Sequence, residues 1–85
     1  MEIRFTETAL EQLNSFKKAN LQEVVKKIKL LLDAISINPY TGIGKPEQLK
    51  HQYSGYWNRR INKEHRLIYK IENDLLIVYS VKGHY

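Results

Sequence analysis

The clearest hydrophobic pattern in the chain lies between residues 21 and 37. Apolar side chains recur there with the spacing of one helix face, at Val24, Val25, Ile28, Leu31, Leu32 and Ile35. Lysines at positions 26, 27 and 29 fall on the opposite side, so the pattern predicts an amphipathic helix with one face on a core. Asn38-Pro39 should end this helix, because proline disfavours helical geometry in the residue before it.

A short strand and a shorter helix are predicted ahead of this element. Residues 2–5 alternate charged and apolar side chains, which is typical of a half-buried strand. Thr8 with Glu11 fits a capping box at the start of the next helix, with Thr6 as an alternative cap, and the helix should end near Lys18. Its apolar face is expected at Leu10, Leu13 and Phe16.

The second half of the chain follows the period of two that is typical of strands. The strand predicted from residue 65 to about residue 71 has Leu67, Tyr69 and Ile71 on one face and Arg66, Ile68 and Lys70 on the other. A tight turn at Asn73-Asp74 leads to a last strand, residues 75–79, whose two apolar faces are expected of a central strand. We therefore predict one α+β domain over residues 1–85, with an N-terminal strand and two helices packed on one face of a twisted antiparallel sheet.

Composition excludes several classes of site. The chain has 85 residues and no cysteine, which rules out disulfides and thiolate zinc sites, and its three histidines lack metal-ligand spacing. We therefore expect neither a metal nor a cofactor. The N-terminus lacks a signal-peptide pattern and no apolar run approaches a membrane span, so no membrane association and a cytoplasmic location are expected.

The net charge of +5 is concentrated in the second half of the chain. Residues 1–43 carry six Lys and Arg against five acids, whereas residues 44–85 carry eight against four. A basic surplus mixed with tyrosines and a tryptophan suits a polyanion whose bases can stack, and RNA is the obvious partner. On charge alone, the alternative that +5 only keeps a small domain soluble remains open.

Three residues fit the chemistry of RNA cleavage. RNA can be cut without a metal or a protein nucleophile, because its own 2′-hydroxyl attacks the adjacent phosphate. The enzyme then needs a base for the 2′-OH proton, an acid for the departing 5′-oxygen and fixed cations for the charge that builds on phosphorus. Glu47 is the candidate base, His84 the candidate acid and Arg66 the candidate cation.

Each candidate also has an ordinary structural explanation. Glu47 follows a proline in a loop and would be solvent-exposed, while Arg66 would be a solvated or salt-bridged arginine on the polar face of a strand. His84 is next to the last residue, where chains are commonly disordered. The other histidines, His51 and His65, are expected to be structural or surface groups.

The pairing of the last two strands raises a difficulty for His84. A two-residue turn at Asn73-Asp74 places Arg66 opposite Val81, and His84 would then point away from Arg66. Gly83 offers a solution, because glycine tolerates the dihedral angles that bend a chain out of strand geometry.

Four stretches of the second half occur together in one known family. They are GKPEQLKH at residues 44–51, SGYWNRRI at 54–61, EHRLIY at 64–69 and the terminal His84-Tyr85. In this combination the chain resembles the Txe/YoeB branch of the RelE-type bacterial toxins, in register from about Asn38 to the end. Residues 1–37 match in layout, and the departures are Tyr56, where phenylalanine is familiar, and Lys82-Gly83, where bulkier residues are expected.

The resemblance implies the toxin of a type II toxin–antitoxin system. Proteins of this branch are ribosome-dependent mRNA endonucleases that enter the A site of the small subunit, cut the codon there and are silenced by a YefM-like antitoxin. By this resemblance Glu47 is the general base, His84 the general acid and Arg66 the group that stabilises the transition state. Tyr85 would help to hold the substrate, and Lys50 and Arg60 would contact phosphate.

Two other functions remain as alternatives at this stage. The chain could be a non-catalytic RNA- or ribosome-binding module that kept the basic face without the chemistry. It could also be a protein-interaction domain whose uneven charge is incidental. Homodimerisation is left open by the sequence.

Overall fold

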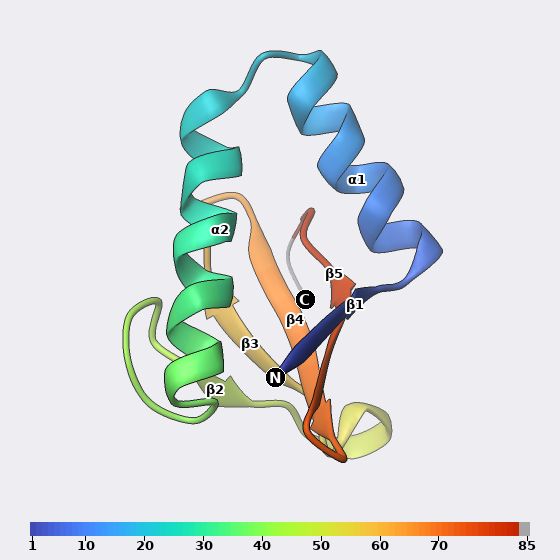
Figure 1. Cartoon of the computed structure of the whole chain (residues 1–85), viewed down its shortest axis with the longest axis vertical. Coiled ribbons are helices and arrows are strands. Elements are labelled where there is room, and N and C mark those ends of the chain that lie inside the picture. The colour runs from blue at the N-terminus through green and yellow to red at the C-terminus, as the bar shows by residue number, and fades with distance from the viewer. Residues whose placement is uncertain (84–85) are drawn as a thin grey trace.

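The computed structural model describes residues 1–83 of the chain. Its elements in order are β1 (Glu2–Phe5), α1 (Glu7–Lys18), α2 (Gln22–Ile37), β2 (Glu47–Gln48), the 3-10 turn η1 (His51–Tyr53), β3 (Trp57–Arg60), β4 (Arg66–Glu72) and β5 (Leu75–Ser80). Figure 1 shows α1 and α2 as an antiparallel pair joined at the top of the view, with β2 near the bottom. None of the helices in the described residues is both long and apolar enough to cross a membrane.

The strands form one five-stranded sheet in the order β1-β5-β4-β3-β2. β5 lies between β1 and β4, as expected of a strand with two apolar faces. The predicted turn at Asn73-Asp74 is confirmed, and both residues have the positive φ angles, 51° and 62°, of a two-residue hairpin turn. One detail differs from the prediction: β1 pairs with β5 in parallel, so the sheet is mixed. Two helices intervene between these strands, and such a crossover allows parallel pairing.

The core lies between the two helices and one face of this sheet. On α2 the predicted face is confirmed, with Ile28, Leu31 and Ile35 buried. The predicted face of α1 is wrong at Leu10, whose side chain is 48% exposed, whereas Ala9 is buried. Positions three apart drift by about 60° per step around a helix, so a strict three-residue repeat leaves the buried face.

Thr6 joins α1 to the sheet. Its side-chain oxygen accepts a hydrogen bond from the backbone N–H of Ala9 (3.1 Å) and donates one to the carbonyl of Tyr79 (2.8 Å). Of the two predicted caps, Thr6 is therefore the correct one. The capping box at Thr8 and Glu11 is wrong, because the helix already begins at Glu7.

A β-bulge changes the pairing of the last two strands. Tyr69 lies opposite Val78, but Ile68 lies opposite Ser80, so Tyr79 is an extra residue in β5. The extra residue reverses the alternation of faces beyond it. The predicted pairing of Arg66 with residue 81 is therefore wrong, because the prediction assumed an unbroken ladder.

Candidate active site

The candidate site lies on the face of the sheet opposite the helices. A row of register partners crosses this face: Glu47 of β2 lies opposite Asn58 of β3, Asn58 opposite Ile68 of β4, and Ile68 opposite Ser80 of β5. Side chains alternate along a strand, so this row lies on the other face from the core residues of β3 and β4. The side chain of Glu47 is exposed at one end of this row, whereas Asn58 and Ile68 in its middle are buried.

Two arginines share this face. Arg60 of β3 lies directly opposite Arg66 of β4, two residues along the strands from the row that begins at Glu47. With strands about 4.8 Å apart and a rise of about 3.3 Å per residue, the Cα atoms of Glu47 and Arg66 are about 12 Å apart. The structure therefore brings the predicted base and the predicted cation to one face, from stretches 19 positions apart in the sequence.

Arg66 is oriented by its own turn. Its Nη1 group donates to the carbonyl of Asn62 (3.1 Å) and lies 3.5 Å from that of His65. The backbone N–H of Arg66 donates to the carbonyl of Gly83 (3.1 Å). Arg66 is thus partly buried and tied to backbone atoms, rather than solvated as in the ordinary interpretation.

Three charged side chains nearby lack partners within residues 1–83. Those of Glu47, Lys50 and Arg60 are exposed and make no hydrogen bond or ion pair in this part of the chain. Lys50 directly precedes the turn η1, and the N–H of the residue before it, Leu49, bonds to the carbonyl of Tyr56 (2.9 Å). The cations are therefore available to a phosphate group.

A buried arginine fixes the loop that leads to Glu47. Arg59 is 0% exposed, and its guanidinium group donates to the carbonyls of Asn38 (2.8 Å), Thr41 (2.9 Å) and Ile43 (3.1 Å) and to the hydroxyl of Tyr69 (3.1 Å). No carboxylate in the described residues pairs with it. The charge is instead stabilised by backbone oxygens, which hold the loop after α2 against β3.

Tyr69 completes this support. Its hydroxyl donates to the carbonyl of Pro39 (2.6 Å) while accepting from Arg59. Burial raises the pKa of Tyr69 although the Arg59 guanidinium acts in the opposite direction. The phenol therefore stays protonated and keeps its donor.

Gly44 joins the same loop to β3. Its φ angle is +85°, and a Cβ atom there would lie 2.8 Å from the Leu31 side chain. The Gly44 carbonyl accepts a hydrogen bond of 2.7 Å from the N–H of Arg60. The glycine that opens the GKPE stretch is thus needed for close packing.

The aromatic residues divide between the two faces of the sheet. Trp57 stacks on Tyr40 and packs against the core, at a centroid distance of 4.9 Å. Tyr56 and Tyr79 meet edge to face at 5.4 Å, and the Lys70 ammonium lies 5.3 Å from the Tyr56 ring. Tyr56 thus contributes aromatic surface beside the Lys70 cation.

The end of the chain is described as far as Gly83. Its φ angle of +82° agrees with the prediction that the chain bends here, in a conformation that favours glycine. The predicted acid His84 and the predicted substrate contact Tyr85 lie outside the described residues.

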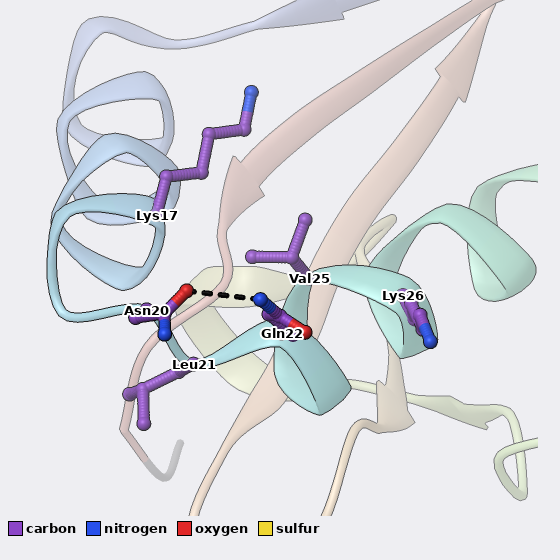
Figure 2. Close-up of a pocket in the computed structure, with 6 residues that line it drawn as sticks. All are labelled: Lys17, Asn20, Leu21, Gln22, Val25 and Lys26. Carbon is purple, nitrogen blue, oxygen red and sulfur yellow. Dashed lines mark hydrogen bonds between the residues drawn. The ribbon is translucent and has the colours of Figure 1, made fainter.

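A hollow of about 280 Å³ lies at the turn between α1 and α2. Figure 2 shows residues that line it, among which Gln22 donates to Asn20 (3.0 Å). This turn is at the top of Figure 1, whereas β2 is near the bottom. Among the described residues no group of three or more His, Asp or Glu side chains is arranged to hold a metal ion.

The sequence analysis missed the supporting role of Arg59 and the partner of His65. Arg59 is two residues after Trp57, so the strand period places both side chains on the same, inward face. The charge of Arg59 argued against burial. His65, expected to be structural or on the surface, is 8% exposed and bonds to Gly83, which is a structural position.

Comparison with known proteins agrees with this geometry. The family described as "YoeB-like toxin of bacterial type II toxin-antitoxin system" matches residues 5–85. The chain belongs to this YoeB-like family. The toxin YoeB of Synechocystis sp. is 47% identical over 85 residues, covering 100% of this chain and 98% of the relative.

Solved structures of YoeB-like toxins have the same fold. A "YoeB/ParE toxin" from Agrobacterium tumefaciens has a TM-score of 0.96 at 32% identity, with 100% of both chains covered. Staphylococcus aureus YoeB, at 43% identity, has been solved as a dimer (TM-score 0.92) and in a heterotetramer with YefM (TM-score 0.91), each covering 100% of this chain and 98% of the other. The RelE-like fold class and the membership in a toxin–antitoxin family, both expected from the sequence, are confirmed.

Proposed function

We propose that this toxin is a ribosome-dependent mRNA endoribonuclease that cuts the codon in the A site of the small subunit. The observation that carries the proposal is the placement of the Glu47 carboxylate and the Arg60–Arg66 pair on one face of the sheet in a YoeB-like chain. A base and fixed cations on one surface are what cleavage by the 2′-hydroxyl requires. Its site of action is then the cytoplasm, where the ribosomes are.

In the proposed reaction the RNA supplies the nucleophile. Glu47 takes the proton of the 2′-hydroxyl, the 2′-oxygen forms a bond to phosphorus, and the bond from phosphorus to the 5′-oxygen breaks. His84 donates a proton to that 5′-oxygen, and Arg66 stabilises the extra negative charge on the phosphoryl oxygens. The products are a 2′,3′-cyclic phosphate and a 5′-hydroxyl end, and DNA is resistant because it lacks the 2′-hydroxyl.

The remaining proposed contacts hold the substrate. Lys50 and Arg60, which are exposed and unpaired within residues 1–83, contact phosphates on either side of the cut. Tyr85 helps to hold the codon. No metal ion or cofactor is needed, because acid, base and cations are all side chains.

We also propose a YefM-like antitoxin as the partner that silences the toxin. Staphylococcus aureus YoeB binds YefM in a solved complex. An acidic or amphipathic segment that folds onto the basic face would cover Glu47 and the arginines at once. The YoeB dimer of the same organism supports a homodimer for this chain as well.

The test is expression without antitoxin in growing bacteria, followed by mapping of mRNA 5′ ends. We expect growth arrest and new 5′-hydroxyl ends within codons. With purified ribosomes, Glu47→Ala and His84→Ala should each lower the cleavage rate by about 10²- to 10⁴-fold, the usual contribution of a general base or acid. Glu11→Ala, which removes an exposed carboxylate from α1, is the matched control and should cut at the parent rate.

Three results would count against the proposal. No new ends and no arrest would remove the nuclease activity. Near-full cleavage by the Glu47 and His84 variants would remove both residues from the mechanism. Ribosome binding that depends on Lys50 and Arg60, without any cleavage, would favour a non-catalytic RNA- or ribosome-binding module of the same fold.

A further inference from the structure

The chain beyond β5 is held by hydrogen bonds from two distant elements. The N–H of Val81 donates to the side-chain oxygen of Gln12 on α1 (2.8 Å), and the N–H of Gly83 donates to Nδ1 of His65 (2.8 Å). The carbonyl of Gly83 accepts from the N–H of Arg66 (3.1 Å). In Figure 1 the red end of the chain accordingly rises beyond β5 in the space between α1 and β4. Residues near a chain end are poorly ordered unless they are held by contacts, and these bonds hold the chain as far as Gly83.

His65 can make its bond in only one protonation form. Nδ1 accepts from Gly83 only if it carries no hydrogen, so the imidazole is neutral with its proton on Nε2. Nε2 lies 3.4 Å from a carboxylate oxygen of Glu64, which favours a proton on that nitrogen. The ring is 8% exposed and packs on Phe16 at a centroid distance of 5.0 Å, so its direction is fixed by the core.

His65 and Arg66 bind the two backbone polar groups of one residue, Gly83. The side chain of His65 holds the N–H of Gly83, and the backbone of the next residue, Arg66, holds its carbonyl. A Cβ atom added at Gly83 would meet nothing within 4 Å. The two hydrogen bonds, together with the buried Val81 two residues earlier, therefore fix Gly83 relative to Arg66.

We propose that His65 is a positioning residue, whose bond to Gly83 sets the point beside Arg66 from which the terminal His84-Tyr85 pair continues. The inference rests on the proposed function, in which His84 is the acid and Arg66 the cation that act on one phosphate. Reacting groups lose about 10²-fold in rate when they are misplaced by 1 Å. A residue that fixes Gly83 without touching the substrate would then control the rate of cleavage through His84, with a smaller effect on substrate binding through Tyr85.

Two substitutions at position 65 separate positioning from packing. His65→Leu keeps an apolar side chain against Phe16 but removes the acceptor. His65→Asn keeps an acceptor, because its Oδ1 atom occupies nearly the place of Nδ1. With ribosomes in excess, we expect the single-turnover cleavage rate of His65→Leu to fall by about 10- to 100-fold.

The other readouts distinguish a positioning role from a merely structural one. The ribosome concentration that gives half the maximal rate should change by less than about threefold, since the proposed phosphate contacts of Lys50 and Arg60 are intact. His65→Asn should recover most of the rate. Parent-like cleavage by His65→Leu, or equal losses in both variants, would overturn the proposal.

A measurement on the unaltered protein keeps the test decisive if His65→Leu fails to fold. Nitrogen chemical shifts of the His65 ring report its tautomer, and amide hydrogen exchange reports the Gly83 bond. We expect a proton on Nε2 and a Gly83 amide that exchanges more slowly than that of Lys82. A proton on Nδ1 in the neutral ring, or a freely exchanging Gly83 amide, would overturn the inference. Neither readout needs RNA cleavage, so a toxin that cuts no RNA would refute the proposed function while these two measurements still decide whether His65 holds Gly83.

Discussion

Neighbouring residues of β3 have opposite environments. Arg59 is fully buried and bonded to the loop after α2, whereas Arg60 is exposed and makes no hydrogen bond or ion pair through its side chain within residues 1–83. The strand alternation alone produces this difference, because successive side chains point to opposite faces. One arginine therefore supports the architecture, and the other is available to a ligand.

Replacing Arg59 with methionine should destabilise the protein severely. The change removes the hydrogen bonds from the guanidinium group to the carbonyls of Asn38, Thr41 and Ile43, and a hydrogen bond from a charged group contributes about 1.5–3 kcal/mol. We expect the free energy of unfolding in urea to fall by at least about 3 kcal/mol. Arg60→Met is the control and should change it by less than about 0.5 kcal/mol. Similar losses in the two variants would show that the burial of Arg59 is not what matters.

At the scale of elements, the short strand β2 depends on the loop before it. β2 has two residues and lies at the edge of the sheet, so its pairing with β3 offers little stability of its own. The loop supplies the rest, through Arg59 and through the close approach of Gly44 to the Leu31 side chain and the Arg60 carbonyl. The position of Glu47 is therefore set by tertiary contacts upstream of it.

Gly44→Ala tests this dependence against a second glycine. A Cβ at Gly44 would lie 2.8 Å from Leu31 Cδ2, in addition to the strain of φ +85°. Gly55 has a similar φ of +96° but open space within 4 Å. We expect Gly44→Ala to lower the free energy of unfolding by about 2–4 kcal/mol and Gly55→Ala by about 1–2 kcal/mol, measured by urea unfolding. Equal effects would mean that the close packing of Gly44 is unimportant.

At the scale of the whole molecule, the sheet separates the core from the charged surface. The helices cover the face with Leu67 and Tyr69, and the opposite face carries Glu47, Arg60 and Arg66. Two of the basic residues of the second half of the chain, Arg60 and Arg66, thus lie side by side on the face away from the helices. Such a surface should bind RNA with an affinity that depends on salt.

The salt dependence should identify the residues that contact phosphate. The binding constant K is measured for single-stranded RNA, either free or bound to the ribosome. The slope of log K against the logarithm of the salt concentration should become shallower by about 0.7 for each phosphate contact removed. We expect this loss in Lys50→Ala and in Arg60→Ala. Lys17→Ala, which removes an exposed lysine from α1, should leave the slope unchanged. Equal losses in all three variants would point to a diffuse charge effect and remove the case for a defined phosphate surface.

Much of the fold could be predicted because local patterns specified it. The stripe on α2, the alternation of β4 and the turn at Asn73-Asp74 each lie within one stretch of sequence, and each is confirmed. Two of the errors arose where contacts with distant elements determine the local structure. The extra residue Tyr79 and the cap at Thr6 both depend on contacts between β5 and other elements.

For the site, the sequence by itself determined which side chains are present and what chemistry they can do. Glu47, Arg66 and His84 were found from residue type and motif, without knowledge of where they lie. Only the tertiary structure decided that Glu47 and Arg66 share a face. The reason is that this depends on the register of β2 with β3 and of β3 with β4, which is set by pairing between stretches far apart in the sequence. It alone also gave His65 its bond to Gly83, since the direction of a hydrogen bond between residues 18 positions apart leaves no local signature in the sequence.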